Sequence, residues 1–346
     1  MISNLGLKFI NLVEKNKKNK AIILDNKHIT FDSLDLDSNK ICNWLLKKNF
    51  STSDVVCISS EKSFFNFSLI IALLKIGITY VVLDKKSPTK RLNQIISQVN
   101  PKAIIISKKN LLKKKSKKIF YKESINFKIK NWNKNDLKNY INRVSSSTIA
   151  YLMFTSGSTG APKGVAISHS KLLHFSEWCR ENFKIQYKDR ATNVNSLFFD
   201  NSVFDIYGSL FNGACLVPLS RSEIINPNVA IKKLKQNKIT IWFSVPSLII
   251  YFQKFNIFDK KRLPFLKKII FGGEGFPKKN LKRLFYNFNK KIHLYNVYGP
   301  TECTCICSSY KISNFDFSKN EMKKLSPFGR NLAKNFKYLI LNENNK

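Results

Sequence analysis

The feature that most constrains this chain is a regular alternation of short β-branched runs with longer helix-like segments. Along residues 54–107 the runs DVVCISS, TYVVLD and KAIIIS are strand-like, and SLIIALLKIG and RLNQIISQV between them have helical periodicity. The alternation returns after residue 212 in GACLVPL, ITIWFSVP, KKIIFGG and IHLYNVYG, with the helix-like VAIKKLKQNK and KKNLKRLF among them. Strands that alternate with helices form largely parallel sheets covered by helices. We therefore expect an α/β fold with two stacked α/β subdomains.

The length of 346 residues and a hydrophobic content of 43% are sufficient to bury a large core. Leu111 to Ser147 is rich in lysine and asparagine, and we expect this segment to join the two subdomains as a surface excursion. The run from Phe64 to Leu83 resembles a membrane span but is interrupted by Asn66, Lys75 and Gly77. It favours a buried helix, turn and strand instead.

The formal net charge of +38 raises the question of an anionic partner. Lysine clusters at 15–20 and 108–118 could dock on phosphates, as in a nucleic-acid or anionic-surface binding protein. Lysine far outnumbers arginine, and asparagine, isoleucine and phenylalanine are also abundant, a pattern typical of compositional drift. We therefore expect solvated loops and no nucleic-acid partner. Seven cysteines without disulfide spacing, and no signal peptide, favour a cytoplasmic protein.

A loop of small and hydroxylated residues follows the strand-like TIAYLMFT. Glycines allow the backbone to turn tightly and approach a ligand, and the hydroxyls offer donors without bulk. Lys163 adds a positive charge, but no Ser or Thr follows it, so this is not a Walker A loop. Alternation after Lys163 predicts a second strand, which makes the loop a hairpin tip over a polyphosphate. Ser168 is the expected N-cap of the next helix, whose apolar stripe comprises Leu172, Phe175 and Cys179.

The loop TSGSTGAPKG resembles the phosphate loop of the adenylate-forming (AMP-binding) superfamily, and other motifs of that family follow in order. The segments ITFDSLDLDSNKICNWL and LLKIGITYVVLDKKSPTKRLNQII look like the first two core motifs of amino-acid adenylation domains. FDNSVFDIYGSL, FGGEG and NVYGPTE resemble the later ones. The resemblance implies an ATP- and Mg²⁺-dependent ligase whose large-domain core occupies residues 1–320, with 321–346 beginning a small β-barrel subdomain.

The same resemblance assigns expected roles to individual residues. The catalytic group would be Thr155, Lys163, Thr301 and Glu302. Glu302 would also be the Mg²⁺ ligand, since a carboxylate is a hard oxygen donor. Tyr298 would stack on adenine and Asn296 would hydrogen-bond its edge, while two glycines leave space for the flat base. The nucleotide-binding set is Ser156, Gly157, Ser158, Thr159, Gly160, Gly272, Gly273, Asn296 and Tyr298.

Asp200 indicates the substrate class. In amino-acid adenylation domains the aspartate of FD pairs with the substrate's α-ammonium group, which acyl-CoA ligases do not need. The family's side-chain pocket maps onto Asn201, Phe204, Ser244, Ile270, Gly272, Val297, Cys305 and Ile306. This mixed lining suggests a neutral amino acid, and resemblance to D-alanine carrier-protein ligases makes D-alanine one specific candidate.

The implied reaction is attack of a substrate carboxylate on the α-phosphate of ATP, which needs no general base because a carboxylate is ionised at neutral pH. Transfer to a phosphopantetheinyl carrier-protein thiol would follow. His169, after the loop, is expected to be structural. Cys303, Cys305 and Cys307 would share one face of a strand lining the pocket, since C-x-C-x-C is not a usual zinc pattern.

The resemblance stops at LSPFGRNLAKNFKYLILNENNK, before the family's TGD-type motif and its C-terminal lobe. Three hypotheses follow: an aminoacyl-adenylating enzyme whose lobe lies on a separate chain or was lost by truncation, a noncatalytic nucleotide or amino-acid binding remnant, and an anionic-surface binder. An acyl-CoA synthetase-like ligase is a further alternative for the chemistry.

Overall fold

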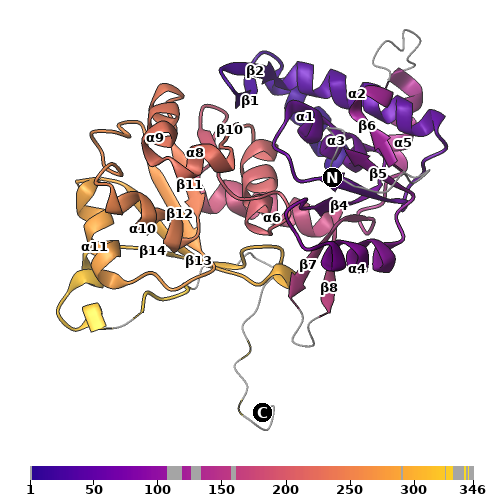
Figure 1. The fold of residues 1–346 in the computed structure, drawn as a ribbon. Helices are drawn as coiled ribbons and strands as arrows, with labels where there is room; N and C mark the ends of the chain where they lie inside the picture. Colours follow the sequence, from indigo (N-terminus) through magenta and orange to yellow (C-terminus); the bar gives the residue numbers. More distant parts are fainter. Residues whose placement is uncertain are drawn as a thin grey trace.

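The computed structural model describes residues 2–106, 119–125, 134–156, 161–289, 291–323, 325–329, 339 and 342. Strands form two sheets, and helices cover them (Figure 1). The six-stranded sheet has the order β6-β5-β3-β4-β7-β8. Its strands are β3 (Val55–Ser59), β4 (Thr79–Leu83), β5 (Ala103–Ile106), β6 (Ile119–Tyr121), β7 (Ile149–Ser156) and β8 (Pro162–Ser168).

The eight-stranded sheet has the order β14-β13-β12-β11-β9-β10-β1-β2. Its strands are β1 (Lys20–Leu24), β2 (Lys27–Thr30), β9 (Arg190–Asn193), β10 (Cys215–Pro218), β11 (Ile241–Ser244), β12 (Lys268–Gly272), β13 (His293–Tyr298) and β14 (Ser308–Lys311). Its six central strands are parallel, and the edge strands β2 and β14 pair antiparallel.

Helices connect and cover these strands. In Figure 1, α1 to α5 lie with the six-stranded sheet on the right, and α8 to α11 lie with the eight-stranded sheet on the left. The α-helices are α1 (Leu5–Asn16), α2 (Phe31–Lys47), α3 (Phe64–Lys75), α4 (Thr89–Val99), α5 (Lys134–Arg143), α6 (His169–Phe183), α7 (Asn201–Val203), α8 (Arg221–Ile225), α9 (Pro227–Gln236), α10 (Pro246–Lys254) and α11 (Lys278–Asn287). After α7 the backbone continues as a π-helical segment (Phe204–Ser209) and a 3₁₀ turn (Leu210–Asn212).

One hydrophobic core lies between the two sheets. It includes Tyr80 and Tyr151 from the six-stranded sheet together with Phe243 and Ile270 from the eight-stranded sheet. Two further clusters bury the opposite faces, one under α9, α10 and α11 and one under α4. The expected α/β fold with two stacked units is therefore confirmed, and the units share a core.

The segment 111–147 does not join the two sheets. The strands on either side of it, β5 and β7, belong to the same sheet, and the chain passes to the other sheet between β8 and β9. Because of its lysine- and asparagine-rich composition, the sequence did not predict helix α5 in this segment. Leu137 and Ile141 of α5 are buried in the shared core. The hairpin β1–β2 also pairs with β10, so the amino-terminal part of the chain completes the other sheet.

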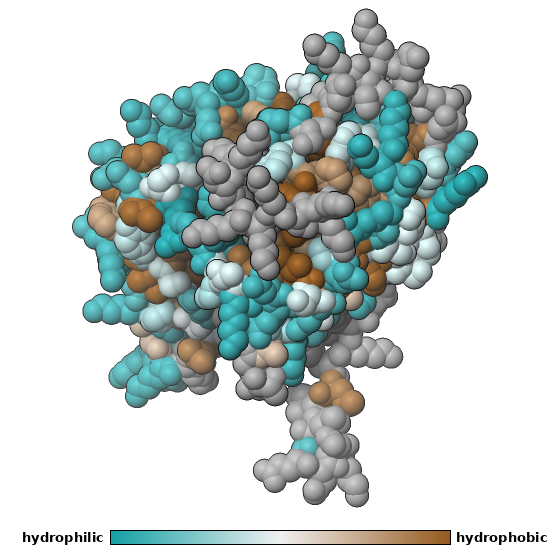
Figure 2. Space-filling view, turned by 45° about the vertical axis from the view of Figure 1, so that its right-hand side comes forward, coloured by the Kyte–Doolittle hydropathy of each residue, from teal (hydrophilic) through white to brown (hydrophobic). Residues whose placement is uncertain are grey.

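The run from Phe64 to Leu83 forms the expected buried helix, turn and strand. Helix α3 ends at Lys75, Gly77 turns the chain with φ of +71°, and β4 follows. Within the described ranges, no helix combines the length and apolar character needed to cross a membrane. Figure 2 shows that hydrophilic residues cover most of one face, with apolar residues visible in smaller groups between them.

Candidate active site

Two segments far apart in sequence meet through a short hydrogen bond. Asp200 follows β9 and Thr301 follows β13, so both lie beyond the carboxyl ends of parallel strands, where α/β sheets bind ligands. Thr301 Oγ1 donates to Asp200 Oδ2 at 2.6 Å. Both residues line a cavity of about 430 Å³, together with Ser87, Arg91, Met153, Phe154, Thr155, Phe198 and Phe199. The structure therefore brings Asp200, Thr301 and Thr155 to one cavity.

The hairpin β7–β8 contributes the third of these groups. Thr155 on β7 pairs directly with Lys163 on β8, and directly paired residues of antiparallel strands project from the same face. Lys163 is exposed, as expected for a mobile cation. Ser156 is the last residue of β7. The remaining expected loop residues, Gly157, Ser158, Thr159 and Gly160, lie outside the described residues.

The electrostatics of the cavity centre on Asp200. Burial raises the pKa of this carboxyl above its usual value, and the charge of nearby Glu302 acts in the same direction. The hydrogen bond from Thr301 opposes the shift. Asp200 is thus a carboxylate short of positive charge, while Glu302 is exposed on the adjoining 3₁₀ turn (Thr301–Cys303). One carboxylate supplies only part of the oxygen ligands that Mg²⁺ takes, so the role of Glu302 as its ligand remains a prediction.

The expected side-chain pocket is mostly buried and apolar. Phe204, Ile270, Val297, Cys305 and Ile306 all belong to the core between the sheets. Phe204 packs against Phe243 with ring centroids 4.7 Å apart. Ser244 is buried, and its hydroxyl accepts from Trp242 Nε1 and donates to the Val245 carbonyl. Asn201, half-buried at the start of α7, follows Asp200 directly.

The residues expected around adenine have other partners here. The Tyr298 ring is 44% exposed and packs against Phe328, with centroids 4.6 Å apart. Asn296 is buried, and its Nδ2 donates to the carbonyls of Ser326 and Pro327. The stacking and edge-bonding roles of Tyr298 and Asn296 remain predictions.

The two glycines expected to leave space for the base differ. A Cβ at Gly272 would lie 2.4 Å from the Val297 carbonyl oxygen, so the neighbouring strand β13 already fills that space. At Gly273, with φ of +87°, a Cβ would meet only Val245 Cγ1 at 3.6 Å. The open position is therefore Gly273, and Gly272 permits the close approach of β12 and β13.

The prediction that Cys303, Cys305 and Cys307 lie on one strand is wrong. Residues Thr301–Cys303 form a 3₁₀ turn, and Thr304 and Cys305 both have positive φ, at 64° and 76°. A Cβ at Gly299 would lie 2.5 Å from the Cys305 carbonyl oxygen, so the chain folds back closely over Gly299–Pro300. This tight return requires left-handed backbone that a strand does not have.

His169 has the structural position that the sequence predicts. It begins α6 and is fully buried, and its Nδ1 accepts from the Leu5 backbone N–H at 3.1 Å. Burial lowers its pKa to about 4, so the imidazole is neutral. Ser168 occupies the N-cap position, although its Oγ pairs with Ser170 Oγ instead of a backbone N–H. The apolar stripe Leu172, Phe175 and Cys179 is buried as expected.

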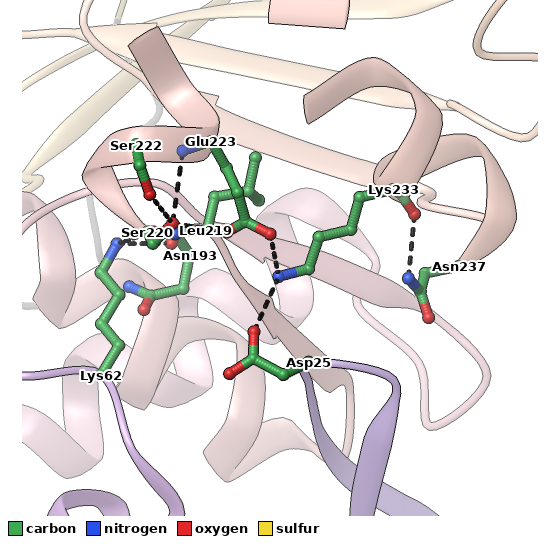
Figure 3. A network of polar contacts seen from close by, with 9 residues as sticks. All are labelled: Asp25, Lys62, Asn193, Leu219, Ser220, Ser222, Glu223, Lys233 and Asn237. Atoms are coloured by element: carbon green, nitrogen blue, oxygen red, sulfur yellow. Dashed lines mark hydrogen bonds and ion pairs between the residues drawn. The ribbon is translucent and has the colours of Figure 1, made fainter. Parts of the chain in front are cut away.

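Sequence reasoning missed a buried polar network beside the site. Lys62, in the loop before α3, donates to the carbonyls of Asn193 and Leu219 at the carboxyl ends of β9 and β10 (Figure 3). Asp205, fully buried, accepts from Asn193 Nδ2 at 2.7 Å and from Asn195 Nδ2. Burial raises the pKa of Asp205 to about 7 and lowers that of Lys62 to about 8. The sequence feature that could have predicted this network is the aspartate inside the apolar run VFDIYG, because a buried charge needs a partner.

The chain belongs to the AMP-binding enzyme family, whose model matches residues 11–346. It is 28% identical over 305 residues to an L-proline--[L-prolyl-carrier protein] ligase of Pseudomonas fluorescens, which covers 86% of this chain and 60% of the ligase. It is also 28% identical over 307 residues to a D-alanine--D-alanyl carrier protein ligase of Bacillus cytotoxicus, covering 85% and 58% respectively. The chain thus spans about 60% of the length of these relatives.

Solved structures agree with the fold. The N-terminal subdomain of Klebsiella oxytoca NpsA, in complex with 3-hydroxyanthranilyl-AMSN, superposes with a TM-score of 0.81 at 18% identity. That match covers all of this chain and 84% of NpsA. The AMPPNP-bound form of the nonribosomal peptide synthetase FmoA3 also gives a TM-score of 0.81, at 20% identity, covering 96% of this chain and 34% of that one.

Proposed function

We propose that this chain carries the core that activates a neutral amino acid as its aminoacyl adenylate, with ATP and Mg²⁺. A substrate carboxylate oxygen would bond to the α-phosphorus while the bond from that phosphorus to the bridging oxygen breaks, which releases pyrophosphate. The observation that carries the proposal is the contact between Thr301 and Asp200 in a cavity that Thr155 also lines. A hydroxyl donor and a carboxylate then stand where an α-phosphate and an α-ammonium group would lie side by side.

The polar residues at the site each have a role in this proposal. Asp200 binds the ammonium group and gives up its hydrogen bond from Thr301, whose single O–H then donates to the α-phosphate beside that of Thr155. Lys163, across the hairpin from Thr155, contributes positive charge. Glu302 would hold Mg²⁺, which would neutralise charge that develops on the phosphates. Alignment and charge stabilisation provide the catalysis, so no general base is needed.

The wider assignments are also proposals. Similarity to carrier-protein ligases supports a phosphopantetheinyl carrier protein as the acceptor, and D-alanine and L-proline as the first amino acids to test. Residues 1–320 would form the AMP-binding core, and 321–346 would begin the β-barrel subdomain. The chain spans about 60% of the length of this relative, and a separate chain that carries a C-terminal lobe is a further partner to test.

The test is amino-acid-dependent ATP–pyrophosphate exchange by the purified chain, with a pool of amino acids that includes D-alanine and L-proline. Glu302→Ala and Asp200→Ala should abolish exchange, whereas Glu14→Ala, at an exposed glutamate on α1, should not. Exchange that persists in Asp200→Ala would contradict the assigned ammonium site. Binding of AMPPNP without exchange would favour the alternative, a noncatalytic binder or a core that requires a second chain.

A further inference from the structure

Arg91 is a charged residue at the cavity to which no role has been assigned. It lies on α4, and among the nine described residues that line the cavity it is the only cation. Asp200 is the only carboxylate in the same set. Among its described lining residues, the cavity therefore has one anionic and one cationic side chain. Asp200 follows β9 of the eight-stranded sheet, and Arg91 lies on α4, which packs with the six-stranded sheet.

Arg91 is held against the strand that leads to the glycine-rich loop. Its Nη2 donates to the Phe154 carbonyl at 3.3 Å, directly before Thr155. This bond uses one of the five N–H donors of a guanidinium group, which leaves the others for a ligand. Ser87, in the turn before α4, lines the same cavity and adds a hydroxyl.

The chemistry of the wall favours a phosphate ligand. A guanidinium fork matches two oxygens of one phosphate group and would repel an ammonium group. We propose that Arg91 binds the β- or γ-phosphate of ATP and, after the reaction, the departing pyrophosphate. This inference rests on the proposed function, in which Thr155 and Thr301 hold the α-phosphate. Arg91 then extends the phosphate site from the α-phosphate along α4.

The test compares nucleotides with and without the outer phosphates. Binding of AMPPNP and of AMP to the full chain is measured by calorimetry for the wild type and for Arg91→Gln. Glutamine removes the charge and keeps N–H donors on a shorter side chain. We expect AMPPNP to bind about 10-fold more weakly and AMP to bind unchanged. Arg91→Lys should lose about 3-fold, because it keeps the charge without the fork.

Lys90→Gln is the matched control, since it removes one positive charge from the exposed position next to Arg91 on α4 and should change neither affinity. Equal weakening of AMP and AMPPNP in Arg91→Gln would show that Arg91 only positions Thr155, and would overturn the inference. Unchanged AMPPNP binding would also overturn it, as would weaker binding of the amino acid alone. If the wild type binds neither nucleotide, the proposed function fails first and the inference with it.

Discussion

In the proposed function, Asp200 is a residue that is unfavourable for folding but required for substrate binding. Asp200 is half-buried, this burial raises the pKa of its carboxyl, and Thr301 is its close hydrogen-bond partner. A raised pKa means that ionisation is less favourable in the folded state than in the unfolded state. The stability that the protonated form contributes is therefore lost as pH rises through the folded pKa. A substrate ammonium group would supply the missing positive charge.

We predict that Asp200→Asn stabilises the chain and removes substrate recognition. At pH 7 the free energy of unfolding should rise, because a partly buried charge is gone. Amino-acid-dependent exchange should fall at least ~100-fold, because a desolvated ammonium group loses its ion pair. Urea unfolding and exchange assays measure the two effects. A variant that is destabilised at pH 7 but still active would contradict both parts.

His169 gives a pH-dependent prediction at the same scale. Its pKa is lowered by burial to about 4, against an unfolded value of 6.5. The unfolded state therefore binds more protons between these values, and stability should fall as pH drops from 6.5 toward 4, by about 2 kcal/mol at pH 4.5. His169→Asn places an amide oxygen near the position of Nδ1 and does not titrate. Urea unfolding across this range should show a smaller loss for the variant.

His28→Asn is the matched control for this experiment, because His28 is an exposed histidine on β2. The loss of stability between pH 6.5 and 4.5 should be smaller in His169→Asn than in His28→Asn. The idea is wrong if His169→Asn and the wild type lose the same stability between pH 6.5 and 4.5.

At the scale of elements, periodicity in the sequence was sufficient to predict a strand or helix that buries one face against its neighbours. The alternating runs became β3, β4, β5, β10, β11, β12 and β13 near their expected positions. Periodicity failed where the backbone needed unusual dihedral angles or a distant partner. The returns at Thr304 and Cys305 depend on positive φ, and the pairing of β1 with β10 depends on a contact across almost 200 residues. Neither leaves a local pattern to read.

The contact between β12 and β13 gives a prediction at this scale. Gly272→Ala would place a Cβ 2.4 Å from the Val297 carbonyl oxygen, which is backbone and cannot rotate away. We expect a loss of about 2–4 kcal/mol in the free energy of unfolding, because the two strands must separate. Gly275→Ala is the control, since a Cβ there would meet only Leu325 Cδ2 at 4.0 Å. Similar unfolding midpoints for the two variants would refute the steric argument.

For the whole molecule, the central question is what holds the two sheets in register around the cavity. The shared core is the largest of the apolar clusters among the described residues, but apolar packing does not specify orientation sharply. Lys62 specifies the orientation more sharply, because its amine, in the loop before α3, donates to carbonyls at the ends of β9 and β10. The family motifs in the sequence located Asp200 and Thr301, but Lys62 is one lysine among many. Only the assembled fold distinguishes it.

We predict that Lys62→Met destabilises the chain by about 3 kcal/mol, because it leaves two strand-end carbonyls without their donor and removes the positive charge that acts on the buried Asp205. The double variant Lys62→Met/Asp205→Asn should recover part of that loss, since removing both charges costs less than removing one. Lys85→Met, which breaks a partly exposed ion pair with Glu61, should cost less than about 0.5 kcal/mol. Urea unfolding of the four proteins measures these differences. If the double variant is less stable than Lys62→Met, the two charges do not compensate each other, and the electrostatic part of the argument is wrong.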